Sequence, residues 1–211
     1  MLMGSCYIGL DPSLAAFGIA IIDTRTQTIL LDQMRADDHH DFIMMSWSIA
    51  NLWNDFMLKY RYYVDSEETY ISQEAPIASG INSGKLNALG YCFYKGCGEI
   101  SSYKRIRTYQ PIKLKQFHLK RGIKKYNKKD TISVVENILD IMKEAGYRVS
   151  IEVSRTKKSL SITDGEADAF MYAIKTYMDR RPGSQITKEI MSLYPTFSNI
   201  KSIEEIKYGE M

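Results

Sequence analysis

The sequence is poor in the features that mark secreted and membrane proteins. Only three of its 211 residues are cysteine, an odd number without framework spacing. That usage excludes a disulfide scaffold and fits a reducing compartment. No apolar run approaches the roughly 18–20 residues that span a bilayer, and no basic region precedes a signal-like apolar core. We therefore expect a soluble protein of the cytoplasm or another intracellular soluble compartment.

The chain also lacks a large excess of charge of one sign. Its net charge is +3, so the total alone does not indicate a nucleic-acid-binding protein. A hydrophobic content of 45% is enough for a substantial core. The length suggests one domain of ordinary size with an appendage. We place the main domain at residues 1–181 and the C-terminal appendage at 182–211.

Apolar periodicity predicts an α/β fold. Strands are expected at Met3–Leu10, Ala16–Ile22, Thr28–Met34, Thr69–Ser72 and Ile106–Tyr109. Helices are expected at 42–56, 79–95, 130–142 and 164–178, with a helical turn or two at 113–119, a short helix at 186–193 and a further turn at 203–208. Asp130 and Asp164 are the expected N-caps. Short connections make the first three strands an antiparallel meander, and the alternation that follows predicts a mixed five-stranded sheet flanked by helices, with a short helical C-terminal tail.

Acidic residues stand at the ends of separate elements. Asp11 ends the first strand, Glu74 ends the fourth, and Asp164 and Asp168 open the late helix four residues apart, on one helix face. A buried carboxylate costs several kcal/mol, roughly, unless it is paired or holds a metal ion. Singly, Asp11 before Pro12 is typical of a turn, Glu74 of a surface residue and Asp164 of an N-cap. Together they favour a metal site.

Carboxylates alone suit Mg²⁺, with Mn²⁺ as a substitute, because these hard cations prefer oxygen ligands. Two ions about 3.5–4 Å apart relieve the repulsion between the carboxylates and can activate water against a phosphodiester. We therefore predict two metal ions per site, bound by Asp11, Glu74, Asp164 and Asp168.

One stretch of the chain is strongly basic. Residues 104–129 hold eleven of the 28 basic residues and no acid, interleaved with aromatic side chains. Such a block needs an anionic partner, and nucleic-acid phosphate is the obvious one. Lys115 and Lys129 are expected at the scissile phosphate, with Lys128 as a substitute for Lys129. Phe117 and Tyr126 can stack on unpaired bases or belong to the core. The predicted nucleic-acid-binding residues are Lys113, Lys115, Phe117, Lys120, Arg121, Lys124, Lys125, Lys128 and Lys129.

At these positions the chain resembles a known family. Ile8-Gly9-Leu10-Asp11-Pro12-Ser13 with Phe17-Gly18 resembles the first motif of the RuvC-type Holliday junction resolvases, within the RNase H-like and retroviral integrase superfamily. Ser72-Gln73-Glu74 is similar to the second motif, and Glu166-Ala167-Asp168-Ala169 to the last. Two intermediate segments are also similar: the glycine-containing helix with Gly84, Leu86 and Gly90, and the basic run Pro111-Ile112-Lys113-Leu114-Lys115-Gln116 followed by Gly122 and Lys129.

The resemblance implies a magnesium-dependent homodimeric endonuclease that nicks opposed strands of four-way DNA junctions, as in DNA recombination and repair. It assigns Asp11, Glu74 and Asp168 as catalytic carboxylates. The family places its remaining acid three residues before the last Asp, where this chain has Gly165. Asp164 or Glu166 must substitute, and helical geometry favours Asp164 because a two-residue offset is rotated by about 200°. The glycine-containing helix at 79–95 is expected at the dimer interface.

Other functions share parts of this pattern. An actin-like or sugar-kinase-like ATPase has a similar opening strand, acid and turn, but it needs a second phosphate loop and an adenosine loop that are missing here. The same fold can also serve a nuclease acting on other branched DNA or on RNA–DNA hybrid, or a non-catalytic DNA-binding protein. Loss of an acid would distinguish the last, which makes the displaced fourth carboxylate the point to examine.

Overall fold

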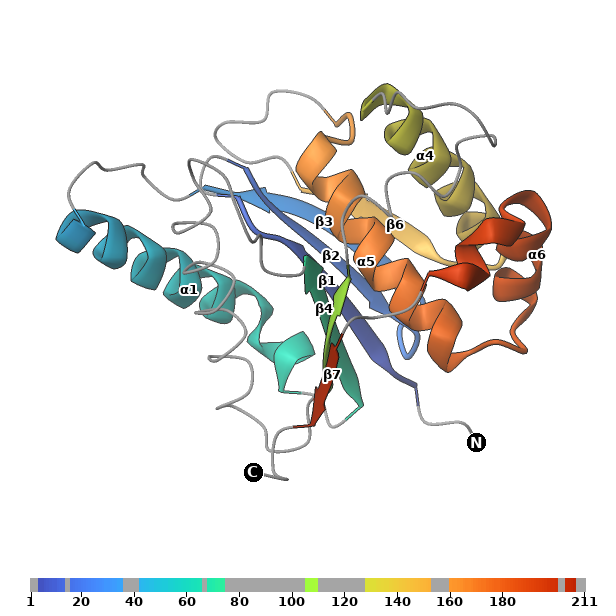
Figure 1. Cartoon of the computed structure of the whole chain (residues 1–211), viewed down its shortest axis with the longest axis horizontal. Coiled ribbons are helices and arrows are strands. Elements are labelled where there is room, and N and C mark those ends of the chain that lie inside the picture. The colour runs from blue at the N-terminus through green and yellow to red at the C-terminus, as the bar shows by residue number, and fades with distance from the viewer. Residues whose placement is uncertain are drawn as a thin grey trace.

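The computed structural model describes residues 4–13, 16–35, 42–65, 68–74, 105–109, 128–152, 160–200 and 204–207. The strands are β1 (Cys6–Asp11), β2 (Phe17–Asp23), β3 (Thr28–Met34), β4 (Thr69–Glu74), β5 (Arg105–Tyr109), β6 (Arg148–Ile151) and β7 (Glu204–Lys207). The helices are α1 (Phe42–Val64), α4 (Lys128–Glu144), α5 (Asp164–Arg180), α6 (Gln185–Leu193) and the 3₁₀ helix η1 (Pro195–Asn199). Figure 1 shows the arrangement of these elements.

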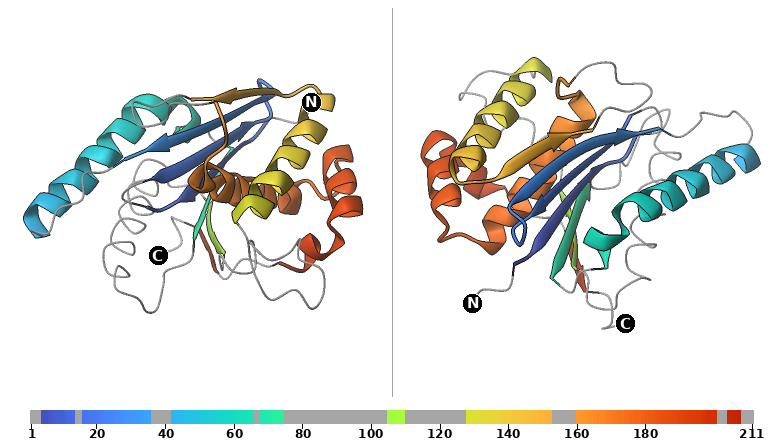
Figure 2. Two further views of the ribbon diagram at one scale, coloured as in Figure 1. Left: turned by 90° about the horizontal axis from the view of Figure 1, so that it is seen from above. Right: turned by 180° about the vertical axis from the view of Figure 1, so that it is seen from behind.

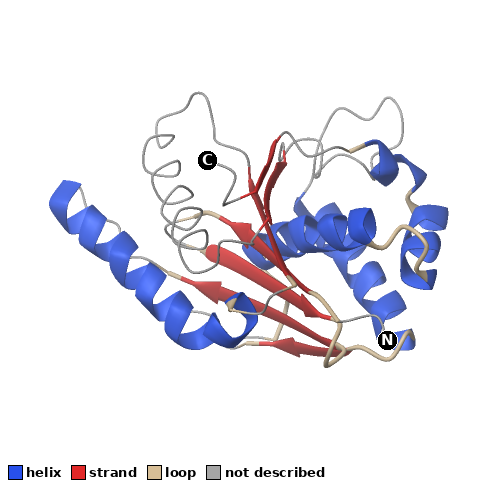
Figure 3. Ribbon diagram, turned by 90° about the horizontal axis from the view of Figure 1, so that it is seen from below, coloured by secondary structure: helices blue, strands red, loops and turns tan. Residues whose placement is uncertain are grey.

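All seven of these strands form one mixed sheet, in the order β6-β3-β2-β1-β4-β5-β7 (Figures 1 and 3). The first three strands pair as the expected antiparallel meander. β4 then pairs parallel to β1, and β5 pairs parallel to β4. This order confirms the α/β class and puts the first and fourth strands side by side, as predicted.

The number of strands was underestimated. The five predicted strands are the central five, and two short strands extend the sheet at its edges. β6 pairs parallel to β3, and β7 pairs antiparallel to β5. β6 lies between the expected helices at 130–142 and 164–178, where the sequence predicts no element, and β7 lies in the predicted turn at 203–208. Both have only four residues, so their apolar patterns are too short to stand out, and pairing with a distant strand decides their conformation.

Helices cover both faces of the sheet (Figure 2). On one face, α1 packs Met45, Ile49 and Phe56 against apolar side chains of the central strands. On the other face, α4, α5 and α6 enclose a second and larger apolar cluster. Side chains alternate between the two faces along each strand, so membership of one cluster or the other reveals which way a strand residue faces.

The segment after α5 joins the larger of these clusters. Ile186 and Ile190 of α6, together with Phe197 and Ile200 around η1, are buried in the same core as α5. The predicted short helix at 186–193 is therefore confirmed as α6. The division of the chain at residue 181 stays a prediction.

The expected helix at 79–95 and the helical turns at 113–119 lie outside the described residues. Within the described part of the chain, no helix combines the length and the apolar character needed to cross a membrane.

Candidate active site

Two of the predicted acidic residues end neighbouring parallel strands. The register of β1 and β4 pairs Cys6 with Thr69 and continues to Leu10 with Gln73. Asp11 and Glu74, the final residues of the two strands, follow directly. Parallel strands end at the same edge of a sheet, so the two carboxylates are attached at adjacent positions there.

The same two residues belong to the same face of the sheet. Tyr7 of β1 is buried in the α5-side cluster, whereas Leu10 of β1 and Ile71 of β4 are buried in the α1-side cluster. Alternation along the strands then assigns Asp11, like Tyr7, to the α5 face. Glu74 is three residues from Ile71, and an odd offset along a strand reverses the side, so Glu74 is assigned to the α5 face as well. Both side chains are partly exposed.

Helix α5 sits directly on the backbone of β1 and β2. A Cβ atom on Gly9 would lie 1.9 Å from the carbonyl oxygen of Ala169, and one on Gly18 would lie 1.9 Å from that of Gly165. Gly18 is the register partner of Asp11. The absence of side chains at Gly9 and Gly18 therefore lets the first turns of α5, with Asp164 and Asp168, approach the end of β1.

The start of α5 is fixed by a capping box. The N-cap is Thr163, whose hydroxyl accepts a hydrogen bond from the backbone N–H of Glu166 at 3.3 Å. The Glu166 carboxylate accepts in return from the Thr163 backbone N–H at 2.8 Å and from its hydroxyl at 3.0 Å. The expectation that Asp164 is the N-cap is wrong, because the Thr163 side chain makes that bond and Asp164 is the first helical residue. Asp130 is likewise not a cap, since α4 begins at Lys128.

The capping box separates the two alternatives for the fourth acidic residue. Glu166 is fully buried, with its carboxylate hydrogen-bonded to Thr163. Asp164 is partly exposed, and Asp168, one turn further along α5, is 8% exposed. The T-x-x-E pattern at 163–166 is a sequence signature of a helix start, and it could have located the cap before the structure did.

The four acidic positions share one end of one face, but the structure does not display a finished metal centre. Among the residues that the structure describes, no three His, Cys, Asp or Glu side chains are arranged to hold a metal ion. The donor set nevertheless has the chemistry of a Mg²⁺ or Mn²⁺ site, since carboxylate oxygens are the ligands that these cations prefer. Convergence of Asp11, Glu74, Asp164 and Asp168 on metal ions stays a prediction.

Two other buried acids of the sheet have structural partners instead. Burial alone would raise the pKa of the Asp23 carboxyl, but hydrogen bonds from the Arg25 side chain and backbone outweigh it and hold that pKa below its ordinary value. Asp32, on the α1 side, accepts a very short hydrogen bond from the Tyr60 hydroxyl. It also forms an ion pair with Lys59 at 3.1 Å. Neither acid belongs to the candidate site.

Most of the predicted nucleic-acid-binding residues lie outside the described part of the chain, namely Lys113, Lys115, Phe117, Lys120, Arg121, Lys124 and Lys125. Lys128 and Lys129 open helix α4, and Lys129 is exposed. Arg107 of the same basic stretch forms an ion pair with Asp179 at 3.1 Å, so at least one of the eleven cations has a structural partner.

Lys129 lies toward the acidic end of the sheet. The strand that follows α4, β6, begins beside Thr28, at the opposite end from Asp11. Since α4 is 17 residues long, it spans about 25 Å and its first turn is displaced toward the Asp11 end. Figure 1 shows α4 and α5 both beginning near the end where β1 and β4 finish.

Comparison with solved structures identifies the same fold in known nucleases. The chain is similar to Thermus thermophilus RuvC in complex with a Holliday junction substrate, with a TM-score of 0.50, 11% identity and coverage of 94% of this chain and 99% of that one. It is also similar to the yeast mitochondrial Holliday junction resolvase Ydc2, with a TM-score of 0.51, 12% identity and coverage of 91% and 82%. No protein-family model and no curated protein matches the sequence. The RNase H-like fold expected from the motifs is thereby confirmed.

Proposed function

We propose that this chain is a divalent-metal-dependent endonuclease that resolves four-way DNA junctions by nicking opposed strands. The observation that carries the proposal is the placement of four acidic positions at one end of one sheet face, with α5 seated on the backbone beneath them. Strand ends and a glycine-seated helix fix the backbone under each acid, which is the support that a precise catalytic site needs. Of the solved structures that share the fold, one is a RuvC in complex with a Holliday junction substrate and another is named as a Holliday junction resolvase.

The four carboxylates have one proposed role, to bind two Mg²⁺ ions. When bound, such a pair activates a water molecule and stabilises the leaving oxygen of a phosphodiester. The chain's own part is to hold Asp11 and Glu74 on adjacent strand ends while α5 presents Asp164 and Asp168. The reaction is hydrolysis: the water oxygen bonds to phosphorus as the bond to the leaving oxygen breaks, without a covalent enzyme intermediate.

Asp164 is the proposed fourth ligand. Glu166 supports the helix start through Thr163, and moving its carboxylate to a metal would break both bonds. Asp164 precedes Asp168 by one turn and lies on the same side of the helix. We expect Asp164→Asn to abolish most cleavage. Glu166→Gln is expected to be mild, because glutamine also completes a capping box; the reverse order of severity would move the fourth ligand to Glu166.

Lysines of the basic stretch supply the proposed contact with DNA. Lys129, which is exposed near the acidic end, and Lys115 are both proposed to contact the scissile phosphate. Removing one phosphate contact should reduce by about one the slope of the logarithm of the binding constant against the logarithm of salt concentration. A Lys129→Ala protein with an unchanged slope would contradict this assignment. Two-fold symmetry of a four-way junction further suggests a homodimer with one site for each nicked strand.

The decisive experiment incubates the protein with end-labelled four-way, three-way and linear duplex DNA, in Mg²⁺ or in EDTA. Symmetric nicks confined to the four-way junction and to Mg²⁺ are expected. Asp11→Asn should remove cleavage and keep junction binding, whereas the matched Asp140→Asn, an exposed acid of α4, should behave as wild type. Cleavage of three-way or linear duplex DNA alone would show that the four-way junction is not the substrate. Binding without cleavage under every metal would indicate a non-catalytic DNA-binding protein.

A further inference from the structure

The acidic end of the sheet continues past the acids to strand β3. Asp11 of β1 pairs with Gly18 of β2, and Gly18 pairs in turn with Gln33 of β3. Residues that lie opposite each other on neighbouring strands project from the same face of the sheet. Gln33, Gly18, Asp11 and Glu74 therefore form one row across the α5 face. The first turn of α5 rests on this row at Gly18, so β3 flanks that turn on the side away from β4.

The α5 face of β3 changes character at this end. Leu31 is buried in the α5-side cluster, and alternation assigns Gln33 and Arg35, which directly follows the strand, to the same face. Gln33 is partly exposed and Arg35 is exposed. On the other face, Met34 still packs against the α1-side cluster. The apolar core therefore ends sooner on the α5 face, and a polar surface begins there beside the acids.

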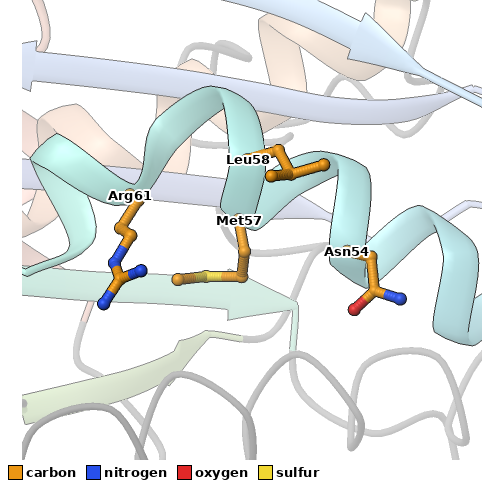
Figure 4. A pocket seen from close by; sticks show the side chains of 4 residues that line it. All are labelled: Asn54, Met57, Leu58 and Arg61. Atoms are coloured by element: carbon orange, nitrogen blue, oxygen red, sulfur yellow. The ribbon is translucent and has the colours of Figure 1, made fainter.

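Arg35 brings a positive charge to this surface that no carboxylate of the described residues neutralises through an ion pair. Three other arginines do form such pairs at 2.8–3.1 Å, namely Arg25, Arg61 and Arg107. Arg61 belongs to a pocket of α1, on the opposite side of the sheet, that is also lined by Asn54, Met57 and Leu58 (Figure 4). Arg35 differs from these three because its guanidinium stays available to an anionic ligand.

A nucleic-acid strand that crosses the acidic row exposes its phosphates to carboxylates. Each phosphate carries one negative charge, so the phosphates on either side of the cut need cations of the protein. On one side, the basic stretch 104–129 includes β5 and continues beyond it. On the other side, Arg35 supplies a cation at the end of β3. Its planar fork of N–H donors can bind one phosphate through two hydrogen bonds.

The strand geometry places Arg35 within a few nucleotides of the acids. β3 and β1 are separated by two strand spacings, about 10 Å, and Arg35 lies two residues beyond the row, about 7 Å further along. The Cα atoms of Arg35 and Asp11 are therefore about 12 Å apart. One strand of duplex DNA carries a phosphate every 3.4 Å or so of helix axis. A separation of about 12 Å thus corresponds to roughly two to four nucleotides.

We propose that Arg35 binds a backbone phosphate of the cleaved strand, about two to four nucleotides from the cut, on the β3 side of the acids. The side-chain amide of Gln33, next to it on the same face, can donate a hydrogen bond to the same strand. This assignment rests on the proposed function for its substrate and on the strand register for its position. Arg35 lies far from the basic stretch in the sequence, and only the pairing of β3 with β2 brings it to the acids.

Junction binding in EDTA, which prevents metal-dependent cleavage, tests the contact. Arg35→Ala should raise the Kd for a labelled four-way junction about tenfold and lower its salt slope by about one. Arg35→Lys keeps the charge, so it should keep the slope. Arg148→Ala is the matched control, because Arg148 is also exposed without an ion pair among the described residues, but begins β6 at the opposite end of the sheet. A Kd and slope for Arg35→Ala equal to those of Arg148→Ala overturn the proposal.

Neutral methylphosphonate linkages locate the phosphate. They are introduced one at a time within six nucleotides of the crossover, on each strand. One position should weaken wild-type binding as much as Arg35→Ala does. The same linkage should cost the Arg35→Ala protein nothing more, because the contact is already absent. Losses that add at every position overturn the contact, and a coupled position more than about four nucleotides from the observed cut overturns its placement. Thermal melts of both variants should match wild type, since both positions are exposed.

Cleavage assays separate this proposal from the proposed function. If one linkage is coupled to Arg35 and the wild type nevertheless cleaves nothing in Mg²⁺, the nuclease proposal fails while the contact stands. If the wild type resolves junctions and no linkage is coupled to Arg35, the contact fails while the nuclease stands.

Discussion

Replacing Gly18 by alanine should disable the site without touching an acidic residue. The new Cβ would lie 1.9 Å from the Gly165 carbonyl oxygen and 2.3 Å from its carbon. Both are backbone atoms, so no side chain can rotate away. Packed carbon and oxygen atoms need at least about 3 Å, so the start of α5 must withdraw by about 1 Å or β2 must distort. Either movement separates Asp164 and Asp168 from Asp11.

The magnitudes follow from this displacement. Overpacking of a rigid site costs about 1–3 kcal/mol, and two opposed backbones favour the upper end. For a chain of 211 residues, each kcal/mol lowers Tm by about 2–4 °C, which gives a decrease of roughly 6–12 °C. A misplacement of about 1 Å in a catalytic constellation can cost about 100-fold in rate. The loss of cleavage should therefore exceed anything that a small loss of stability produces.

Calorimetry and single-turnover junction cleavage in Mg²⁺, well below Tm, measure the two effects. Gly183→Ala is the matched control, because nothing lies within 4 Å of its Cβ position, and surface changes of this kind stay within about 0.5 kcal/mol. An unchanged Tm in Gly18→Ala would refute the close packing of α5. A lowered Tm with wild-type cleavage would show that the acids of α5 take no part in the reaction.

Three further predictions concern stability, each measured by urea unfolding. Burial, with a contribution from Asp179, raises the pKa of Tyr109 to about 12, above its ordinary value of 10.0. Because the fold favours the neutral phenol, the free energy of unfolding should fall as pH rises from 10 towards 12. A free energy of unfolding that does not change over this pH range would contradict the prediction. Thr163→Ala should cost about 0.5–2 kcal/mol by removing the cap of α5, while Thr163→Ser should recover most of it. Tyr60→Phe should cost about 1–3 kcal/mol, because the buried Asp32 carboxylate loses a hydrogen-bond donor. A cost of only a few tenths of a kcal/mol would show that the hydrogen bond from Tyr60 to Asp32 does not stabilise the fold.

The sequence predicted the centre of the sheet better than its edges. Thr28–Met34 was predicted with both of its bounds, because an apolar run flanked by polar turn residues is a complete local signal. Arg148–Ile151 and Glu204–Lys207 gave no such signal. Each is a strand of only four residues, and its conformation is set by an edge formed by residues far away in the chain.

The same contrast applies to the candidate site. The end positions of Asp11 and Glu74 followed from local patterns, and the adjacency of their strands followed from the expected topology. The close packing of α5 on Gly9 and Gly18 is a long-range contact. The sequence could therefore indicate the importance of these glycines only through the family motif. The cap at Thr163 was missed for another reason: Asp164 is itself a good capping residue, and only the T-x-x-E pattern at 163–166 distinguishes Thr163 from it in the sequence.

The pairing of β7 with β5 has a consequence for biosynthesis. The polar edge of β5 is formed by residues 105–109, whereas the strand that covers it is formed by residues 204–207. A ribosome must add about a hundred residues, some 5–20 s of synthesis, before that edge can be protected. During this interval the open edge can recruit a strand from another nascent chain, so slow translation or early termination upstream of residue 204 should favour aggregation.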